Sequence, residues 1–191
     1  MKFCSSCGSA EIVYKTPKGD NRNRHLCRAC DSIFYENPKI VAGCIPVWEN
    51  KVLMCRRAIE PRYGLWTLPA GFMENDETTV EAAERETREE ACTNVVGSRL
   101  FALFNLPQIN QVYMVFLSRL VSPEFAPGEE SLDCNLYQQD EVPWNEIAFP
   151  TITYSLKFFF EDRTKGDFIF HTGDIVREGS ESRFFERPVL N

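Results

Sequence analysis

The sequence has no long apolar run. None of its hydrophobic stretches approaches the roughly 18 to 20 residues that span a bilayer. Its opening residues, MKFCSSCGSA, also lack the apolar segment of a secretory signal peptide. Histidine is scarce, and we interpret both His25 and His171 as surface or packing residues rather than groups that transfer protons. These absences exclude a membrane-spanning protein, and we expect a cytoplasmic one.

The chain also lacks a basic excess. Its net charge is −7, and its 43% hydrophobic and 26% charged residues are typical of a soluble globular protein rather than a disordered one. The segment 74–90 alone holds eight acidic and two basic residues, so the rest is nearly neutral. A solvated helix face could carry this charge, but crowded carboxylates also favour a bound cation. Nucleic acid is not expected as a partner.

Eight cysteines without a secretory signal favour metal binding or free thiols over disulfides. Four of them form the pattern C-x2-C-x19-C-x2-C, which predicts a zinc ribbon over residues 1–36 with a hairpin turning at residues 18–20: Cys4, Cys7, Cys27 and Cys30. An iron–sulfur centre and a redox dithiol pair are the alternatives. Four thiolates leave no open coordination position, so the Zn2+ should be structural.

The ribbon holds six basic and four acidic residues. That excess is too small to indicate nucleic-acid binding, so a scaffolding or dimer-forming role is favoured. The remaining cysteines are scattered singly: Cys44, Cys55, Cys92 and Cys134.

A candidate catalytic segment follows Asn37-Pro38. Two apolar stretches around residues 49–51 predict a hairpin, residues 66–68 an extended piece, residues 69–71 a turn, and residues 79–91 a helix capped by Asp76 or Thr78. At about 100° per residue the core-facing stripe of this helix is Val80, Ala83, Thr87 and Ala91. Glu86, Glu89 and Glu90 fall beside that stripe. Their partial burial predicts a site for a hard divalent cation.

The residues GFMENDETTVEAAERETREEACT, from Gly71 to Thr93, resemble the Nudix box. Six polar or glycine positions are in register: Gly71, Glu77, Arg85, Glu86, Glu89 and Glu90. The sequence departs from the pattern at Thr87, Cys92 and Thr93. A left-handed helix terminus at Cys92 would cost about 1 kcal/mol.

The resemblance implies an α/β/α sandwich with a mixed sheet, and an enzyme that hydrolyses a nucleoside diphosphate linked to another moiety with metal-activated water. It assigns Glu86, Glu89, Glu90 and the Gly71 carbonyl to Mg2+ or Mn2+, and pairs Glu77 with Arg85.

Other site residues are predicted outside the box. Glu130, in APGEESLDCNLY, is the candidate general base, with Asp133 next and a solvated acidic loop as the bland alternative. Arg57 is the candidate phosphate contact. Among the aromatic residues, Trp66 and Phe72 are candidates to stack a purine or flavin, although core packing is the commoner role of such residues.

The ribbon joined to this domain resembles NADH pyrophosphatases, which also remove NAD caps from RNA. Their SQPWPFPxS signature is absent from LFALFNLPQINQVYMVF. The segments YENPKIVAGC, FAPGEESLDC and EDRTKGDFIFHTG instead resemble FAD and ADP-ribose pyrophosphatases of plant chloroplasts and their bacterial relatives. We therefore expect cleavage of FAD to FMN and AMP, or of ADP-ribose to AMP and ribose 5-phosphate. The alternatives are an NADH or NAD-cap hydrolase, and a non-catalytic nucleotide sensor.

Three regions are expected along the chain: a ribbon over residues 1–36, a Nudix domain over 37–172, and a tail or dimer arm over 173–191. Within the domain, QVYMVFLSRLV and CNLYQQDEV are predicted strands and residues 152–163 a predicted amphipathic helix. No plastid transit peptide is seen, which favours a bacterial cytoplasmic enzyme. The expected partners are a small dinucleotide and a second copy of the chain in a homodimer, with no membrane.

Overall fold

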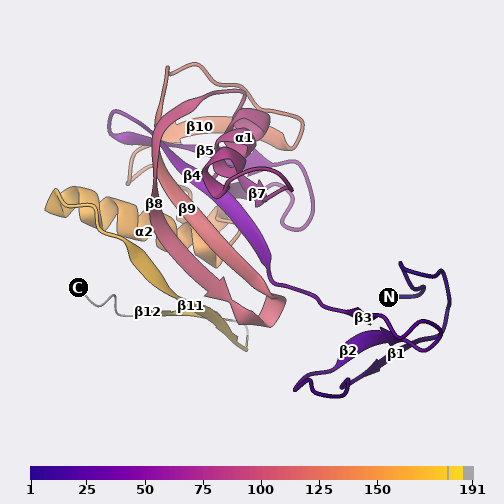
Figure 1. Ribbon diagram of the computed structural model, residues 1–191. Coiled ribbons are helices and arrows are strands. Elements are labelled where there is room, and N and C mark those ends of the chain that lie inside the picture. The colour runs from indigo at the N-terminus through magenta and orange to yellow at the C-terminus, as the bar shows by residue number, and fades with distance from the viewer. Residues whose placement is uncertain (180, 187–191) are drawn as a thin grey trace. The chain divides into compact units, whose positions relative to one another are not determined.

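The computed structural model describes residues 1–179 and 181–186. The chain divides into two compact units, Met1–Asn37 and Pro38–Asn191 (Figure 1). The first unit contains a three-stranded antiparallel sheet in the order β1 (Ile12–Lys15), β2 (Arg24–Cys27) and β3 (Ile33–Phe34). The turn between β1 and β2 includes Gly19, whose φ of 86° suits glycine. The predicted hairpin is confirmed.

The second unit is built on one mixed sheet with the order β10-β5-β4-β9-β8-β11-β12, to which β6 and β7 add beside β5 and β4. The pairs β4–β9 and β8–β11 are parallel, and the other pairs are antiparallel. The strands are β4 (Lys39–Trp48), β5 (Lys51–Arg57), β6 (Trp66–Thr67), β7 (Ala70–Phe72), β8 (Val95–Leu106), β9 (Gln111–Leu120), β10 (Ser131–Tyr137), β11 (His171–Glu178) and β12 (Glu181–Glu186).

Two helices, α1 (Thr79–Ala91) and α2 (Pro150–Lys165), cover opposite faces of this sheet. Side chains of β4 alternate between the faces: Val41 and Ile45 join the core under α2, whereas Ala42 and Cys44 join the core under α1. Short 3-10 helices lie at Pro107–Ile109 (η1) and Trp144–Glu146 (η2). The predicted α/β/α sandwich is confirmed. No helix in the described part of the chain is long and apolar enough to cross a membrane.

Two sequence expectations require correction. Residues 69–71, expected as a turn, include part of β7, which pairs with only three residues of β4 and is too short to show an alternating pattern. Residues 173–178 and 181–186, expected in a tail or dimer arm, belong to β11 and β12, which extend the central sheet. They become strands because β8 supplies a parallel partner for β11. Residues 180 and 187–191 of that expected arm lie outside the described residues.

Helix α1 begins and ends on local signals. Its N-terminus has a capping box in which Glu81 N–H donates to Thr78 Oγ1 (3.2 Å) and Thr78 N–H donates to Glu81 Oε2 (2.7 Å). Of the two predicted caps, Thr78 is therefore the one used. The helix ends at Ala91, and its C-cap residue Cys92 has a left-handed φ of 48°, the conformation for which the family pattern has glycine.

Candidate functional site

The four ribbon cysteines gather their sulfur atoms in one place. The Sγ atoms of Cys4 and Cys30 lie 3.6 Å apart, those of Cys7 and Cys27 lie 3.7 Å apart, and all four fall within 4.8 Å of one another. Tetrahedral zinc with Zn–S bonds of about 2.3 Å requires S–S separations of about 3.8 Å. The donor set therefore fits a structural Zn2+, which would crosslink a unit too small to build a large core.

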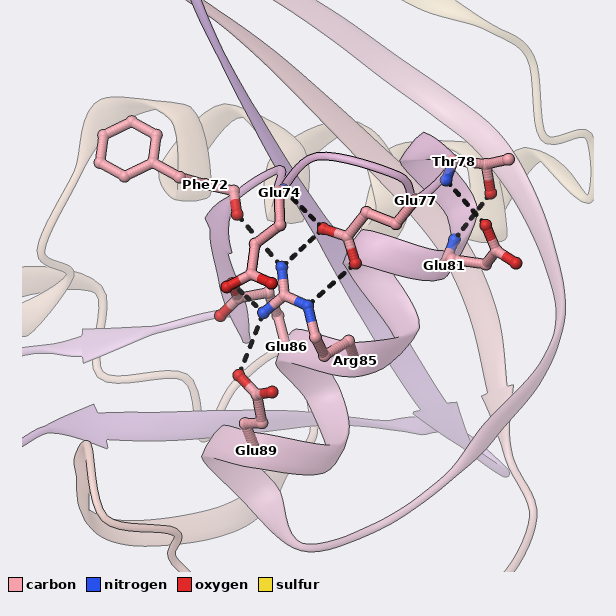
Figure 2. A network of polar contacts seen from close by, with 8 residues as sticks. All are labelled: Phe72, Glu74, Glu77, Thr78, Glu81, Arg85, Glu86 and Glu89. Carbon is pink, nitrogen blue, oxygen red and sulfur yellow. Dashed lines mark hydrogen bonds and ion pairs between the residues drawn. The ribbon is translucent and has the colours of Figure 1, made fainter.

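In the second unit, Arg85 ties the acidic residues of the box together (Figure 2). Its Nε and Nη2 donate to the two carboxylate oxygens of Glu77 at 3.0 and 2.8 Å. Its Nη1 donates to Glu86 (2.8 Å) and Glu89 (3.0 Å), and Nη2 also donates to the Phe72 carbonyl (3.1 Å). The predicted Glu77–Arg85 pair is confirmed. The pair joins the loop before α1 to the helix, and the other Arg85 hydrogen bonds position the carboxylates of Glu86 and Glu89.

Glu77 is held in its ionised form by this arrangement. The Arg85 hydrogen bonds, together with the Glu74 N–H that donates to Oε1 at 2.7 Å, lower the pKa of Glu77 to about 2. Glu77 is therefore an anion at neutral pH and orients Arg85.

Glu86 lies against Gly71 of β7. A Cβ atom built on Gly71 would overlap the Glu86 carboxylate, so only glycine allows this approach. Glu86 is 9% exposed, and its burial raises its pKa, an effect that Arg85 opposes and that Glu89 and Glu130 reinforce. Gly71 and Glu86, both of which the resemblance assigns to the cation, thus lie against each other where a side chain on residue 71 would not fit.

Glu90 is the most buried carboxylate of the group. It is 6% exposed, and its Oε2 atom has no hydrogen-bond partner among the described residues. Burial, followed by repulsion from Glu86, raises the pKa of Glu90 to about 8, although Arg57 opposes the shift. A buried, unsatisfied carboxylate oxygen beside a second carboxylate fits a divalent cation with oxygen ligands.

The three glutamates are less tightly gathered than the cysteines. Within residues 1–179 and 181–186, only the ribbon cysteines bring three or more donor atoms within 4.8 Å of one another. Glu89 is the most open of the three glutamates, with a side chain 57% exposed, and Arg85 holds it. Glu86 and Glu90 are the two buried glutamates of the three.

Glu130 lies in the loop before β10, and this loop contacts the end of α1. Gly128 N–H donates to the Glu90 carbonyl (3.0 Å), and a Cβ on Gly128 would overlap the Glu89 carbonyl. The loop is thereby fastened to the end of α1, and Glu130 contributes to raising the pKa values of Glu86 and Glu90. Glycine at position 128 is a functional signal that sequence reasoning missed. Asp133 instead lies opposite Arg56 in the β10–β5 ladder.

Arg57 lies near Glu90, since it opposes the rise in the pKa of that residue. It is 9% exposed, its Nε donates to the Pro61 carbonyl (3.0 Å), and its guanidinium lies 5.1 Å from the ring centroid of Phe149. Phe149, which precedes α2, was not anticipated from the sequence. The structure thus brings a cation and an aromatic ring to the side of the carboxylates.

The two predicted stacking residues differ. Phe72 is 50% exposed, and Figure 2 shows its ring pointing away from the Arg85 network, where Lys39 Nζ lies 4.9 Å from its centroid. Trp66 is 7% exposed and packs edge-on against Tyr137 in the core under α2. The Trp66 expectation is corrected: the side chain fills the core because β6 pairs with β5 and directs it inward. Of these two candidates, Phe72 is the one whose ring is exposed.

Each of the two histidines packs against an aromatic ring of its own unit. His25 neighbours the Tyr14 ring in the ribbon sheet. His171 lies 2.8 Å from the buried Asp162 and stacks on Phe158.

Comparisons with known proteins agree with this architecture. The family model described as NUDIX domain matches residues 37–161, and the one described as Nudix N-terminal matches residues 2–36. A NUDIX hydrolase structure from Nitrosomonas europaea is 51% identical with a TM-score of 0.89, and the alignment covers 93% of this chain and 100% of that one.

Two relatives carry more specific names. A protein from Photobacterium profundum named NAD-capped RNA hydrolase NudC is 31% identical over 134 residues, which cover 69% of this chain and 47% of that protein. One from Methanocaldococcus jannaschii named ADP-ribose pyrophosphatase is 26% identical over 119 residues, covering 60% of this chain and 69% of the relative. The chain thus spans about half the length of the first relative. With both family models matched and the box residues brought together by β7, α1 and the loop between them, the chain belongs to the Nudix hydrolase family and carries its N-terminal zinc ribbon.

Proposed function

We propose that the chain is a metal-dependent pyrophosphatase that hydrolyses the diphosphate joining a nucleotide to a second group. The observation that carries this proposal is the buried Oε2 atom of Glu90, which lacks a hydrogen-bond partner among the described residues. Beside it, Glu86 is pressed against Gly71. A divalent cation bound there would offset phosphate charge and lower the pKa of a water molecule that attacks phosphorus.

The protein residues then have distinct roles. Glu86 and Glu90 would hold the cation, with Glu89 and the Gly71 carbonyl as further ligands. Glu130, fastened near them by the loop at Gly128, accepts the proton of the attacking water. Arg57 binds the diphosphate, and the exposed ring of Phe72 stacks a base of the substrate. Attack breaks the P–O–P bridge and leaves two monophosphates.

Among substrates, NADH and NAD-capped RNA are favoured over FAD. The support is the Photobacterium profundum relative, which is named NAD-capped RNA hydrolase. Neither this relative nor the one from Methanocaldococcus jannaschii is named for FAD. ADP-ribose is the second candidate, because one relative is named for it and the SQPWPFPxS signature is absent. An RNA substrate would revise the expectation that nucleic acid is not a partner.

Product analysis by chromatography tests the proposal. The zinc-loaded chain is incubated with Mg2+ or Mn2+ and offered NADH, NAD-capped RNA, ADP-ribose and FAD in parallel. AMP with a second monophosphate from NADH, or a 5′-monophosphate RNA end from the capped RNA, is the expected result. Turnover confined to ADP-ribose or FAD would reject the NAD assignment. Nucleotide binding without turnover of any substrate would indicate a sensor.

A further inference from the structure

Two cysteines outside both metal centres face each other between neighbouring strands. Cys134 of β10 is directly opposite Cys55 of β5, and their Sγ atoms lie 3.5 Å apart. Both belong to the core under α1, with Cys55 1% and Cys134 8% exposed. Sequence reasoning treated these residues as scattered single cysteines, because 79 positions separate them in the chain.

We propose that Cys55 and Cys134 are a redox modification site that forms a disulfide when the protein meets a peroxide. Residues directly opposite in an antiparallel pair have Cα atoms about 4.5 to 5.5 Å apart, within the range that disulfides span. The sulfur atoms must approach by about 1.5 Å to reach a bond length of about 2.0 Å. Rotation of the side chains with a small strand shift supplies this movement.

The reaction balances with peroxide as the oxidant. The Cys134 sulfur attacks one peroxide oxygen, the O–O bond breaks, and a sulfenic acid and one water form. The Cys55 sulfur then attacks the sulfur of Cys134 and expels the hydroxyl as a second water. The two thiols together lose two electrons and two protons, and the peroxide gains both.

The fold gives an oxidant a route to the pair. β10 lies at the edge of the sheet, and among the described strands it pairs only with β5. A register irregularity between Ser131 and Asp133 lies immediately before Cys134. Edge strands next to such irregularities open at lower free energy than central strands. Cys134, the more exposed thiol of the pair, is therefore the first to be oxidised.

The pair is joined to the candidate catalytic helix. Cys134 Sγ also lies 3.5 Å from the Glu90 carbonyl, and β10 begins just after Glu130. Drawing Cys134 toward Cys55 weakens the contact with Glu90 and shifts the start of β10. This consequence rests on the proposed function: oxidation should lower turnover about three- to tenfold, and dithiothreitol should restore it.

The test uses the full zinc-loaded chain, treated with graded hydrogen peroxide, blocked with N-ethylmaleimide and digested at acidic pH. Mass spectrometry should find a peptide containing Cys55 linked to one containing Cys134, with two hydrogens lost. Cys55→Ser should lack the linked peptide and keep its turnover in peroxide. Cys92→Ser, which removes an exposed thiol outside the pair, is the matched control and should form the linked peptide. Cys134→Ala repeats the test if Cys55→Ser does not fold.

The linked peptide is identified by mass, so its formation is independent of whether any substrate is turned over. Recovery of Cys55 and Cys134 as separate alkylated or singly oxidised residues, at doses that oxidise Cys92, would overturn the proposal. So would a bond from Cys134 to a different cysteine. A linked peptide with unchanged turnover would overturn its connection to the catalytic helix.

Discussion

The carboxylate of Glu86 lies so close to the backbone of Gly71 that any β-carbon on that glycine would overlap it. The contact joins β7 to α1, two elements whose residues are separated by the loop at positions 73–78. Arg85 secures the same junction by donating to both Glu86 and the Phe72 carbonyl. Backbone spacing at one glycine therefore sets the position of a candidate metal ligand.

Substituting Gly71→Ala should displace the Glu86 carboxylate and reduce turnover about 100-fold, since misplacing a catalytic group by about 1 Å has effects of that size. Gly97→Ala is a control: no atom lies within 4 Å of its added Cβ, although its φ of 67° makes the substitution mildly strained. Steady-state kinetics on both variants separates displacement of the Glu86 carboxylate from general destabilisation by a glycine substitution. Equal losses in the two would indicate general destabilisation instead.

Glu86→Gln and Glu90→Gln should each lower kcat at least about 100-fold while the fold stays intact, because each removes a charged ligand of the cation. Glu124→Gln, on an exposed loop, is the control of equal charge change. Turnover at saturating Mg2+ and circular dichroism are the measurements. Near-normal turnover in either variant at saturating Mg2+ would refute that ligand assignment.

Glu130→Gln should lower kcat about 100-fold or more with a smaller change in KM, as expected for loss of a general base. Its neighbour Glu129 is exposed on the same loop, and Glu130 but not Glu129 is among the main influences on the pKa values of Glu86 and Glu90, so Glu129→Gln is the matched control. The two variants make the same chemical change in the same loop, so a difference in kcat between them reports the position of Glu130. Comparable kcat values for the two variants would remove Glu130 from the mechanism.

The Glu77–Arg85 pair should make stability depend on acid pH. The pKa of Glu77 is lowered from 4.5 to about 2, so its contribution to stability is complete above about 4.5 and is lost as the pH falls toward 2. Glu77→Gln should therefore have a lower denaturation midpoint than the unmodified chain at pH 6, with a gap that narrows below pH 4.5. Urea titrations between pH 3 and 6 measure it. A gap that stays constant over this range would show that Glu77 acts through packing.

The ribbon should contain about one zinc per chain, and Cys27→Ser should lose it together with the fold of residues 1–37, because Cys27 is fully buried. Metal analysis and hydrogen exchange measure the two effects, with Cys92→Ser as the control. Protection should persist in the second unit, which has its own core. A stable ribbon free of zinc would contradict the assignment.

The local features of this protein could be predicted because they depend on neighbouring residues. The spacing of the four cysteines, the choice of Asp76 or Thr78 as the cap of α1, and the Glu77–Arg85 pair each involve positions within one motif. The periodicity of α1 also placed Glu86 and Glu90 at the edge of its buried face. Burial of an acid beside an apolar stripe is a property of the helix itself.

Longer-range pairing was decided only by the tertiary structure. Trp66 became a core residue that packs against Tyr137, and residues 173–178 became part of β11 beside β8. Both partners lie far away in the sequence. Three further contacts also join residues that are distant in the sequence. Gly128 packs against the end of α1, the Arg57 guanidinium lies over the Phe149 ring, and Cys55 lies opposite Cys134. The sequence by itself determined the metal-ligand types and the helix that presents them. Which distant residues complete the site depends on strand order and register, which local propensity does not encode.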